Sequence, residues 1–170
     1  MSEPLARKLQ KIAKAFGMRV LGVRHSGKKL SYVDEMYTPD QLDMVLPNCD
    51  YVVVTLPLTK DTKHLFDSIK FNLMKPSAFF INIGRGEIVV EVDLITALQK
   101  GIIAGAGLDV FEQEPLSVDS PLWKMENVII TPHIAGSTEN YNQRVIENVL
   151  IPNLKKYISG TLPSVNNVNF

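Results

Sequence analysis

The amino-acid sequence predicts an α/β fold, in which helices cover both faces of a doubly wound parallel sheet. Two features of the sequence indicate this. Stretches rich in β-branched and other apolar residues alternate along the chain with stretches of helical periodicity. Several apolar stretches show no alternation with polar residues, which is typical of strands buried on both faces. The length of 170 residues, 45% of them apolar, suits one globular domain with a short appendage.

The first half of the chain predicts two helices and two strands. Residues 5–16 form a helix ending at Gly17, because one face is apolar; that face consists of Leu5, Leu9, Ile12, Ala13 and Phe16. A short strand follows at residues 18–23. Thr38 caps the next helix, with Pro39 in its first turn and Gln41 completing a capping box. Residues 51–55 are β-branched and apolar, as expected for a buried strand.

The second half continues the alternation. Residues 68–74 form a helix before Pro76, and residues 91–100 form another, with acidic residues in its first turn. The remaining strands are expected at residues 78–83, 104–110 and 127–131. A last helix runs from about residue 138 to 158 with a kink at Pro152, and a loop-like tail covers residues 160–170.

Charge and composition exclude several classes of protein. Eighteen Lys and Arg residues balance eighteen Asp and Glu residues, so we expect no electrostatic binding of nucleic acid. No apolar run approaches the roughly 18 residues of a membrane span, and residues 1–10 lack the apolar core of a signal peptide. With Cys49 as the single cysteine and no N-x-S/T sequon, we expect a cytoplasmic protein, although an organelle remains open.

Candidate ligand-binding residues follow the predicted strands, because ligands of such folds bind at the carboxyl ends of the strands. Arg85 lies between Gly84 and Gly86, and glycine permits close approach of a ligand to the backbone. A guanidinium there is able to hold a carboxylate through two parallel hydrogen bonds. The alternative is a solvated arginine on a surface turn.

A histidine and a carboxylate follow two other strands. His133, after residues 127–131, is suited to donate a proton to a carbonyl oxygen as hydride reaches the carbon. Glu114, five residues after Asp109, is suited to orient that imidazole. The alternatives are a structural histidine and one of several acids in a loop that also contains Glu112. No Cys/His cluster has the spacing of zinc ligands, so no metal site is predicted. His25 and His64 lie in polar segments and are expected to be solvated.

Five stretches together resemble the D-isomer-specific 2-hydroxyacid dehydrogenases, a family that includes glyoxylate/hydroxypyruvate reductases and phosphoglycerate dehydrogenases. They are residues 50–62, 82–86, 107–116, 121–123 and 127–133. The resemblance covers nearly the whole chain. It implies a Rossmann-like fold, hydride transfer between NAD(P)H and a 2-keto or 2-hydroxy acid such as glyoxylate or hydroxypyruvate, and a homodimer. The formate-oxidising branch typically has glutamine where Glu114 stands, and is set aside.

The resemblance also implies roles for single residues. Arg85 would bind the substrate carboxylate, His133 would be the general acid/base, and Glu114 would be its carboxylate partner. Asp109 would contact the nicotinamide carboxamide. The residues that would line the dinucleotide are Leu56, Pro57, Thr62, Ile83, Gly84, Ala135 and Gly136.

The sequence departs from the family in one region. The G-x-G-x-x-G fingerprint and the strand before it are absent, so we expect a Rossmann-like doubly wound parallel sheet lacking the first strand and the glycine-rich loop. Residues 1–137 would form a truncated dinucleotide-binding domain, and residues 138–170 a helix and tail returning to an absent substrate domain. Residues 18–23 and 78–83 would then form unpaired, aggregation-prone edges. We expect the chain alone to bind dinucleotide weakly and to turn over slowly. The alternatives to an active enzyme are a dinucleotide-sensing or subunit-binding module and an inactive remnant.

One segment bears on the choice of cofactor. NAD-dependent folds usually carry an acid after the second strand, where it binds the ribose 2′-hydroxyl. Here Arg24 occupies that region, followed by Lys28 and Lys29. Arginine suits a 2′-phosphate, so NADP is favoured over NAD. The alternative is a solvated basic turn.

Overall fold

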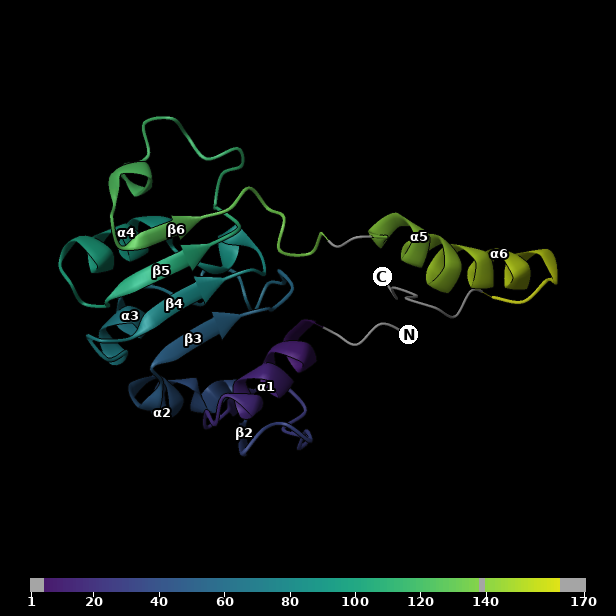
Figure 1. The fold of residues 1–170 in the computed structure, drawn as a ribbon, viewed down its shortest axis with the longest axis horizontal. Helices are drawn as coiled ribbons and strands as arrows, with labels where there is room; N and C mark the ends of the chain where they lie inside the picture. The colour runs from purple at the N-terminus through teal and green to yellow at the C-terminus, as the bar shows by residue number, and fades with distance from the viewer. Residues whose placement is uncertain (1–4, 138–139, 163–170) are drawn as a thin grey trace. The chain divides into compact units, whose positions relative to one another are not determined.

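The computed structural model describes residues 5–137 and 140–162 (Figure 1). These residues form two compact units. One extends to Ala135, and the other begins at Gly136. The predicted boundary after residue 137 lies two residues beyond this division. The expected start of the last helix at residue 138 lies outside the described residues, as does most of the expected tail.

The first unit contains a four-stranded parallel sheet in the order β3-β4-β5-β6. The strands are β3 (Tyr51–Val54), β4 (Phe79–Asn82), β5 (Gly105–Leu108) and β6 (Val128–Ile130). Each lies within its predicted stretch, because uniformly apolar, β-branched segments favour buried pleated strands. The α/β, Rossmann-like fold class is thus confirmed.

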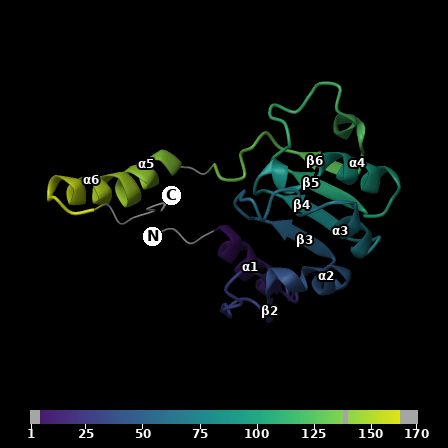
Figure 2. The same cartoon turned by 180° about the vertical axis from the view of Figure 1, so that it is seen from behind.

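One face of this sheet carries the hydrophobic core. Helices α3 (Ser68–Leu73) and α4 (Glu91–Gln99) cover that face, as the view from behind shows (Figure 2). Phe80 packs against Phe66 and Phe71, with ring centroids 5.0 and 5.2 Å apart, and all three rings are buried. These contacts anchor the sheet from which the candidate site projects.

The opposite face differs from the prediction that helices cover both sides. Tyr51, Phe79 and Ile129 are exposed on it, and the Tyr51 and Phe79 rings stack with centroids 5.9 Å apart. The residues are apolar enough for burial, as their composition predicts. Within residues 5–135, however, α3 and α4 both pack on the Phe80 face.

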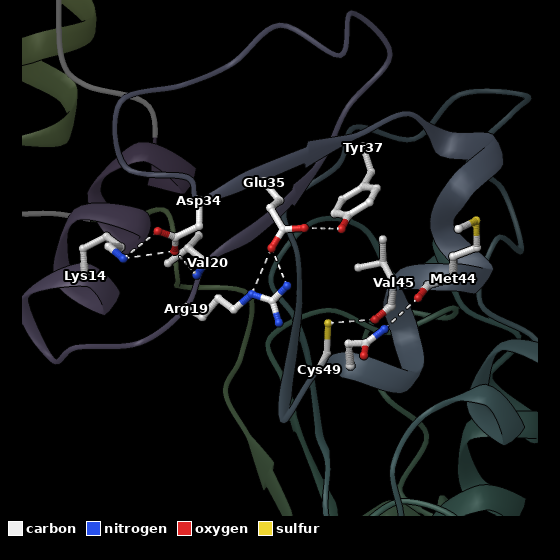
Figure 3. Close-up of polar contacts among 10 residues, drawn as sticks. Lys14, Arg19, Val20, Asp34, Glu35, Tyr37, Met44, Val45 and Cys49 are labelled. Carbon is white, nitrogen blue, oxygen red and sulfur yellow. Dashed lines mark hydrogen bonds and ion pairs between the residues drawn. The ribbon is translucent and has the colours of Figure 1, made fainter.

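A separate two-stranded parallel sheet pairs β1 (Leu21–Val23) with β2 (Glu35–Tyr37). Polar contacts surround this sheet (Figure 3), and Val23 packs against the hydrophobic core. Arg19 and Tyr37 both bind the Glu35 carboxylate, and Asp34 accepts hydrogen bonds from Lys14 and from the Val20 amide. Helix α1 (Leu5–Ala15) precedes β1 and buries no residue, so its apolar face is exposed.

The two sheets correct the expected position of the open edges. Residues 18–23 do form an edge, since β1 pairs with β2 alone among the described residues. The expectation for residues 78–83 is wrong, because β4 lies between β3 and β5 and the open edge belongs to β3. The reason is that β2 was not predicted. Counting it makes residues 51–54 the strand next to the missing central one.

The remaining elements follow local sequence signals. The Gln41 side chain accepts a hydrogen bond from the Thr38 amide at 3.1 Å, and the predicted capping box is present. The short helical turns η1 (Pro39–Gln41), α2 (Leu42–Val45) and η2 (Leu46–Asn48) follow. In the second unit, α5 (Tyr141–Val145) and α6 (Ile151–Ile158) flank a π-helical turn, η5 (Ile146–Leu150). The irregularity thus precedes Pro152, which lacks the amide for a regular helical bond.

Candidate active site

The carboxyl ends of the four strands meet at one edge of the sheet. The register aligns Val54 with Asn82, Asn82 with Leu108, and Leu108 with Ile130. The segments that follow these residues carry most of the predicted site. This is the edge at which open α/β sheets bind their ligands.

His133 and Glu114 form a hydrogen-bonded pair at this edge. The distance from His133 Nδ1 to Glu114 Oε2 is 2.8 Å, and both side chains are more than a third exposed. The other carboxylate oxygen, Oε1, accepts a hydrogen bond from the Phe111 amide at 3.1 Å. Burial opposes ionisation of Glu114, but the hydrogen bonds from His133 and Phe111 and the charges of His133 and Arg85 hold the pKa of its carboxyl below the ordinary value.

The ionised carboxylate fixes the orientation of the imidazole. A carboxylate only accepts hydrogen bonds, so Nδ1 carries the proton of this contact. No other described residue makes a hydrogen bond to the second ring nitrogen, Nε2. Nε2 of His133 is therefore available for a further hydrogen bond.

Asp109 holds the backbone around His133. Its carboxylate is 2% exposed and accepts hydrogen bonds from the Thr131 hydroxyl at 2.5 Å and from the amides of Ile134 and Ala135 at 2.9 and 2.8 Å. The His133 amide donates to the Asp109 carbonyl at 2.9 Å. Burial raises the pKa of Asp109, but these hydrogen bonds lower it by more, so the net shift is downward. The contacts support the left-handed backbone of His133, whose φ is 54°.

Arg85 is placed by a buried asparagine. Asn82 is 1% exposed, and its side chain donates to the Arg85 carbonyl at 2.9 Å and accepts from the Gly84 amide at 3.1 Å. The Arg85 guanidinium donates to the Gly84 carbonyl at 2.7 Å, and its charge contributes to the lowered pKa of Glu114. Asn82 was not predicted as a site residue. The signal that indicates it is a polar residue ending an otherwise apolar strand.

Both glycines beside Arg85 are sterically required. A Cβ on Gly84 would lie 2.7 Å from the Leu56 carbonyl oxygen, and one on Gly86 would lie 1.7 Å from the Phe111 carbonyl oxygen. The Arg85 segment therefore packs directly against the backbone of the segments after β3 and β5.

The structure brings together most, but not all, of the residues expected to line a dinucleotide. The Thr62 hydroxyl donates to the Pro57 carbonyl at 2.8 Å, and the Ile83 amide donates to the Val54 carbonyl at 3.1 Å, so both lie at the strand-end edge with Leu56 and Ala135. Arg24 follows β1 in the two-stranded sheet, where its amide donates to the Tyr37 carbonyl. Gly136 belongs to the second unit.

His64 is exposed to solvent, as expected, and it also has a partner. Its Nε2 lies 3.0 Å from Oε1 of Glu112, an acid expected only as a neighbour of Glu114. Among the described residues, no three His, Cys, Asp or Glu side chains gather in a way that could hold a metal ion. No described helix has the length and hydrophobicity needed to cross a membrane.

Comparisons with known proteins identify the family. The family model for the D-isomer specific 2-hydroxyacid dehydrogenase, NAD binding domain, matches residues 4–135. Glyoxylate/hydroxypyruvate reductase B of Shigella boydii is 61% identical over 97 residues, which are 57% of this chain and 30% of that protein. The reductase B of Salmonella newport is 49% identical over 125 residues, which are 72% of this chain and 39% of that protein. The chain thus spans about a third of the length of these curated relatives.

Solved structures agree with this assignment. The NADPH-dependent glyoxylate/hydroxypyruvate reductase of Sinorhizobium meliloti, in complex with NADP and sulfate, superposes with a TM-score of 0.86 at 35% identity, over 97% of this chain and 52% of that chain. A D-isomer specific 2-hydroxyacid dehydrogenase of Xanthobacter autotrophicus, in complex with NADPH and MES, has a TM-score of 0.81 at 38% identity, over 90% of this chain and 62% of that chain. The chain described here therefore belongs to the D-isomer specific 2-hydroxyacid dehydrogenase family, through its NAD-binding domain.

Proposed function

We propose that the protein reduces a 2-keto acid, such as glyoxylate or hydroxypyruvate, to the 2-hydroxy acid with NAD(P)H, and catalyses the reverse oxidation. The observation that supports this best is the His133–Glu114 pair at the strand-end edge, with Nε2 of His133 directed to no described residue. A reduced nicotinamide, when bound, supplies the hydride that reaches the carbonyl carbon. His133 Nε2 donates the proton that the carbonyl oxygen takes up, so the product is the alcohol.

Each neighbouring residue has a proposed part in this step. Arg85 binds the substrate carboxylate, which orients the carbonyl toward His133. Glu114 holds the imidazole through Nδ1 and stabilises its protonated form before the transfer. Asp109 was expected to contact the nicotinamide carboxamide. Because its carboxylate is nearly fully buried and accepts three hydrogen bonds from the chain itself, we propose that it acts by fixing the backbone of residues 133–135.

The described residues fit the nicotinamide end of a dinucleotide better than its pyrophosphate. Gly84 lets the strand-end segments pack closely, and Ile83 and Ala135 lie beside them. The sequence contains G-x-G twice, at residues 84–86 and 105–107, but Val89 and Val110 stand where the third glycine belongs. We therefore propose that residues 56–62, Ile83, Gly84 and Ala135 contact the nicotinamide side, and that the affinity of this chain alone for dinucleotide is low.

The proposed preference is for NADP over NAD. The two structural relatives above hold NADP or NADPH, and Arg24 stands where an NAD-dependent fold usually carries an acid. Dissociation constants for NADPH and NADH, measured by fluorescence, test the preference. Arg24→Ala should weaken NADPH binding about fivefold, as expected for one exposed ion pair, and leave NADH binding unchanged. Equal losses for both cofactors would contradict the assignment.

A keto-acid panel tests the reaction itself. The chain is assayed alone and as a chimera, in which the part of the Salmonella newport reductase that precedes the matched region is joined to its N-terminus. We expect NADPH-dependent reduction of glyoxylate or hydroxypyruvate by the chimera and slow turnover by the chain alone. A folded chimera that reduces no 2-keto acid would refute the proposal.

A second candidate function is a module that binds dinucleotide or another subunit without turnover. The open edges of β1 and β3 and the exposed apolar face of α1 favour it, because such surfaces are typically covered in an assembly. A homodimer is the assembly we propose. Sedimentation of the purified chain distinguishes a dimer from a monomer, and binding of NADPH by an inactive chimera would favour the module over the enzyme.

A further inference from the structure

A second histidine–carboxylate pair contacts the same loop that carries Glu114. His64 Nε2 lies 3.0 Å from Glu112 Oε1, and the two side chains are 43% and 38% exposed. His64 has a φ of 54°, in the left-handed region that a residue other than glycine adopts only when its surroundings support it. Neither residue has a part in the proposed proton transfer. Their pairing therefore calls for another explanation.

Glu112 links this histidine to the start of α4. Its second oxygen, Oε2, accepts a hydrogen bond from the Glu91 amide at 3.3 Å. In return, Glu91 Oε2 accepts a hydrogen bond from the Glu112 amide at 3.1 Å. The two glutamates thus bind each other's backbone, which joins the loop after β5 to the first turn of α4. Burial, and to a lesser degree the charge of Glu112, raise the pKa of Glu91.

The segment that carries His64 also runs beside the segment that carries Arg85. The His64 amide donates to the Glu87 carbonyl at 2.8 Å, and the Phe66 amide donates to the Ile88 carbonyl at 3.0 Å. A β-bridge then pairs Phe66 with Val89. His64 is therefore bonded through its backbone to the Arg85 segment and through its ring to the Glu114 loop.

Little free space separates the Arg85 segment from the loop that carries Glu112 and Glu114. Gly86 touches the Phe111 backbone so closely that no side chain fits. The cavity between them has a volume of about 10 Å³ and is lined by residues of both segments, including Gly86, Glu91, Phe111 and Glu112. That volume is about the minimum for a single water molecule. The separation of the two segments is therefore set by these contacts.

We propose that His64, Glu112 and Glu91 are positioning residues that fix the Arg85 segment relative to the Glu114–His133 pair. This inference rests on the proposed function, because it assigns the spacing between a carboxylate-binding arginine and a proton donor. Misplacing reacting groups by about 1 Å costs about a hundredfold in rate, so a pair that contributes little to global stability still affects catalysis.

The test uses three variants of His64. His64→Ala and His64→Asn remove the contact to Glu112, and asparagine also tolerates the left-handed backbone. His64→Gln retains an N–H donor at similar reach and has the same backbone strain as alanine. We expect kcat/KM for the keto acid to fall about tenfold to a hundredfold in His64→Ala and His64→Asn, and to be largely restored in His64→Gln.

A matched control separates positioning from a general loss of an ion pair. Lys75 and Asp50 form an exposed pair at 2.8 Å, at the start of β3 and far along the strand from the candidate site. Lys75→Ala should leave kcat/KM unchanged. Equal losses in Lys75→Ala and His64→Ala, or full activity in His64→Ala and His64→Asn, would overturn the proposal.

A second measurement makes the outcome independent of activity. Amide hydrogen exchange of Glu91 and Glu112 is recorded by NMR in the purified chain. We expect exchange at both amides to be faster in His64→Ala than in the parent chain, and slower again in His64→Gln. Unchanged exchange would overturn the proposal even in an active protein. If the keto-acid assay fails in the parent but exchange responds as expected, the proposed function fails, and the positioning of these segments by His64, Glu112 and Glu91 stands.

Discussion

The loop after β5 carries the glutamates of two histidine–glutamate pairs. The pairs have similar geometry and differ in the second hydrogen bond that each carboxylate accepts. Both histidines have a φ of 54°, and both lie about 3 Å from their carboxylate, at 2.8 Å for His133 and 3.0 Å for His64. His133 contacts Glu114 through Nδ1, and the second oxygen of Glu114 accepts a hydrogen bond from the Phe111 amide in its own loop. His64 contacts Glu112 through Nε2, and the second oxygen of Glu112 accepts a hydrogen bond from the Glu91 amide at the start of α4.

We propose that this difference separates a catalytic pair from a positioning pair. Glu114 joins its own loop to the segment of His133, and its other oxygen binds within that loop. Glu112, in contrast, joins its loop both to the segment of His64 and to the first turn of α4. In this proposal the same two residue types have two roles, which differ in the backbone group that the second carboxylate oxygen binds.

The first way to break the comparison is to replace each histidine by asparagine. His133→Asn in the chimera should lower kcat by about a hundredfold to ten-thousandfold, because it removes the proton donor. His64→Asn should cost no more than the hundredfold expected of a positioning residue. Steady-state kinetics on hydroxypyruvate measures both. Equal effects of the two substitutions would mean that the pairs do not differ in role.

Arg85→Ala should have a different kinetic signature from either histidine variant. Loss of a charge-assisted carboxylate contact of about 2 to 3 kcal/mol should raise KM for the keto acid about 30- to 150-fold. The dissociation constant for NADPH should stay unchanged, because Arg85 is proposed to contact substrate alone. A loss confined to NADPH binding would reassign Arg85 to the dinucleotide.

The pH dependence of stability should have opposite signs for Glu114 and Glu91. The pKa of Glu114 is lowered by folding, so its ionised form stabilises the fold above the unfolded value, and this contribution is lost as the pH falls through the lowered pKa. The pKa of Glu91 is raised by folding, so the fold loses stability as the pH rises through that raised pKa.

Urea unfolding between pH 3 and pH 7 measures this contrast. Glu114→Gln should destabilise the chain at pH 7 and have a smaller effect at pH 3. Glu91→Gln retains the acceptor for the Glu112 amide and should be neutral or slightly stabilising at pH 7. Both effects should be small, because Glu114 is more than a third exposed and screened by solvent. Destabilisation by Glu91→Gln at pH 7 that exceeds that of Glu114→Gln would reverse the assignment.

The sequence predicts the core elements well where local signals are strong. The strands of the four-stranded sheet lie within their apolar stretches, and Gln41 caps its helix as expected. Glu35-Met36-Tyr37 is too short and polar to indicate a strand, and the contact of Glu35 with Arg19 comes from tertiary structure. Because this strand is not predicted from the sequence, the second open edge is expected at β4, whereas the structure has it at β3.

The site shows the same division between local and tertiary signals. The resemblance to the family drew attention to Arg85, Glu114 and His133, and the structure places two of them in direct contact. The pairing of His64 with Glu112 spans 48 positions of the chain, and nothing in either polar segment indicates it. Asn82 was hidden for the opposite reason, since it looks like the end of an apolar strand until its two hydrogen bonds are seen.

The protonation of the His133 ring, observed by ¹⁵N NMR of the purified chain at neutral pH, decides whether this histidine is oriented as proposed. We predict a proton on Nδ1 that is held by Glu114, whereas any proton on Nε2 exchanges freely with solvent. The signal of the Nδ1 proton should be lost in Glu114→Ala. A ring protonated at Nε2 alone, and unchanged by Glu114→Ala, would contradict the orientation of His133 by Glu114 on which its proposed role rests.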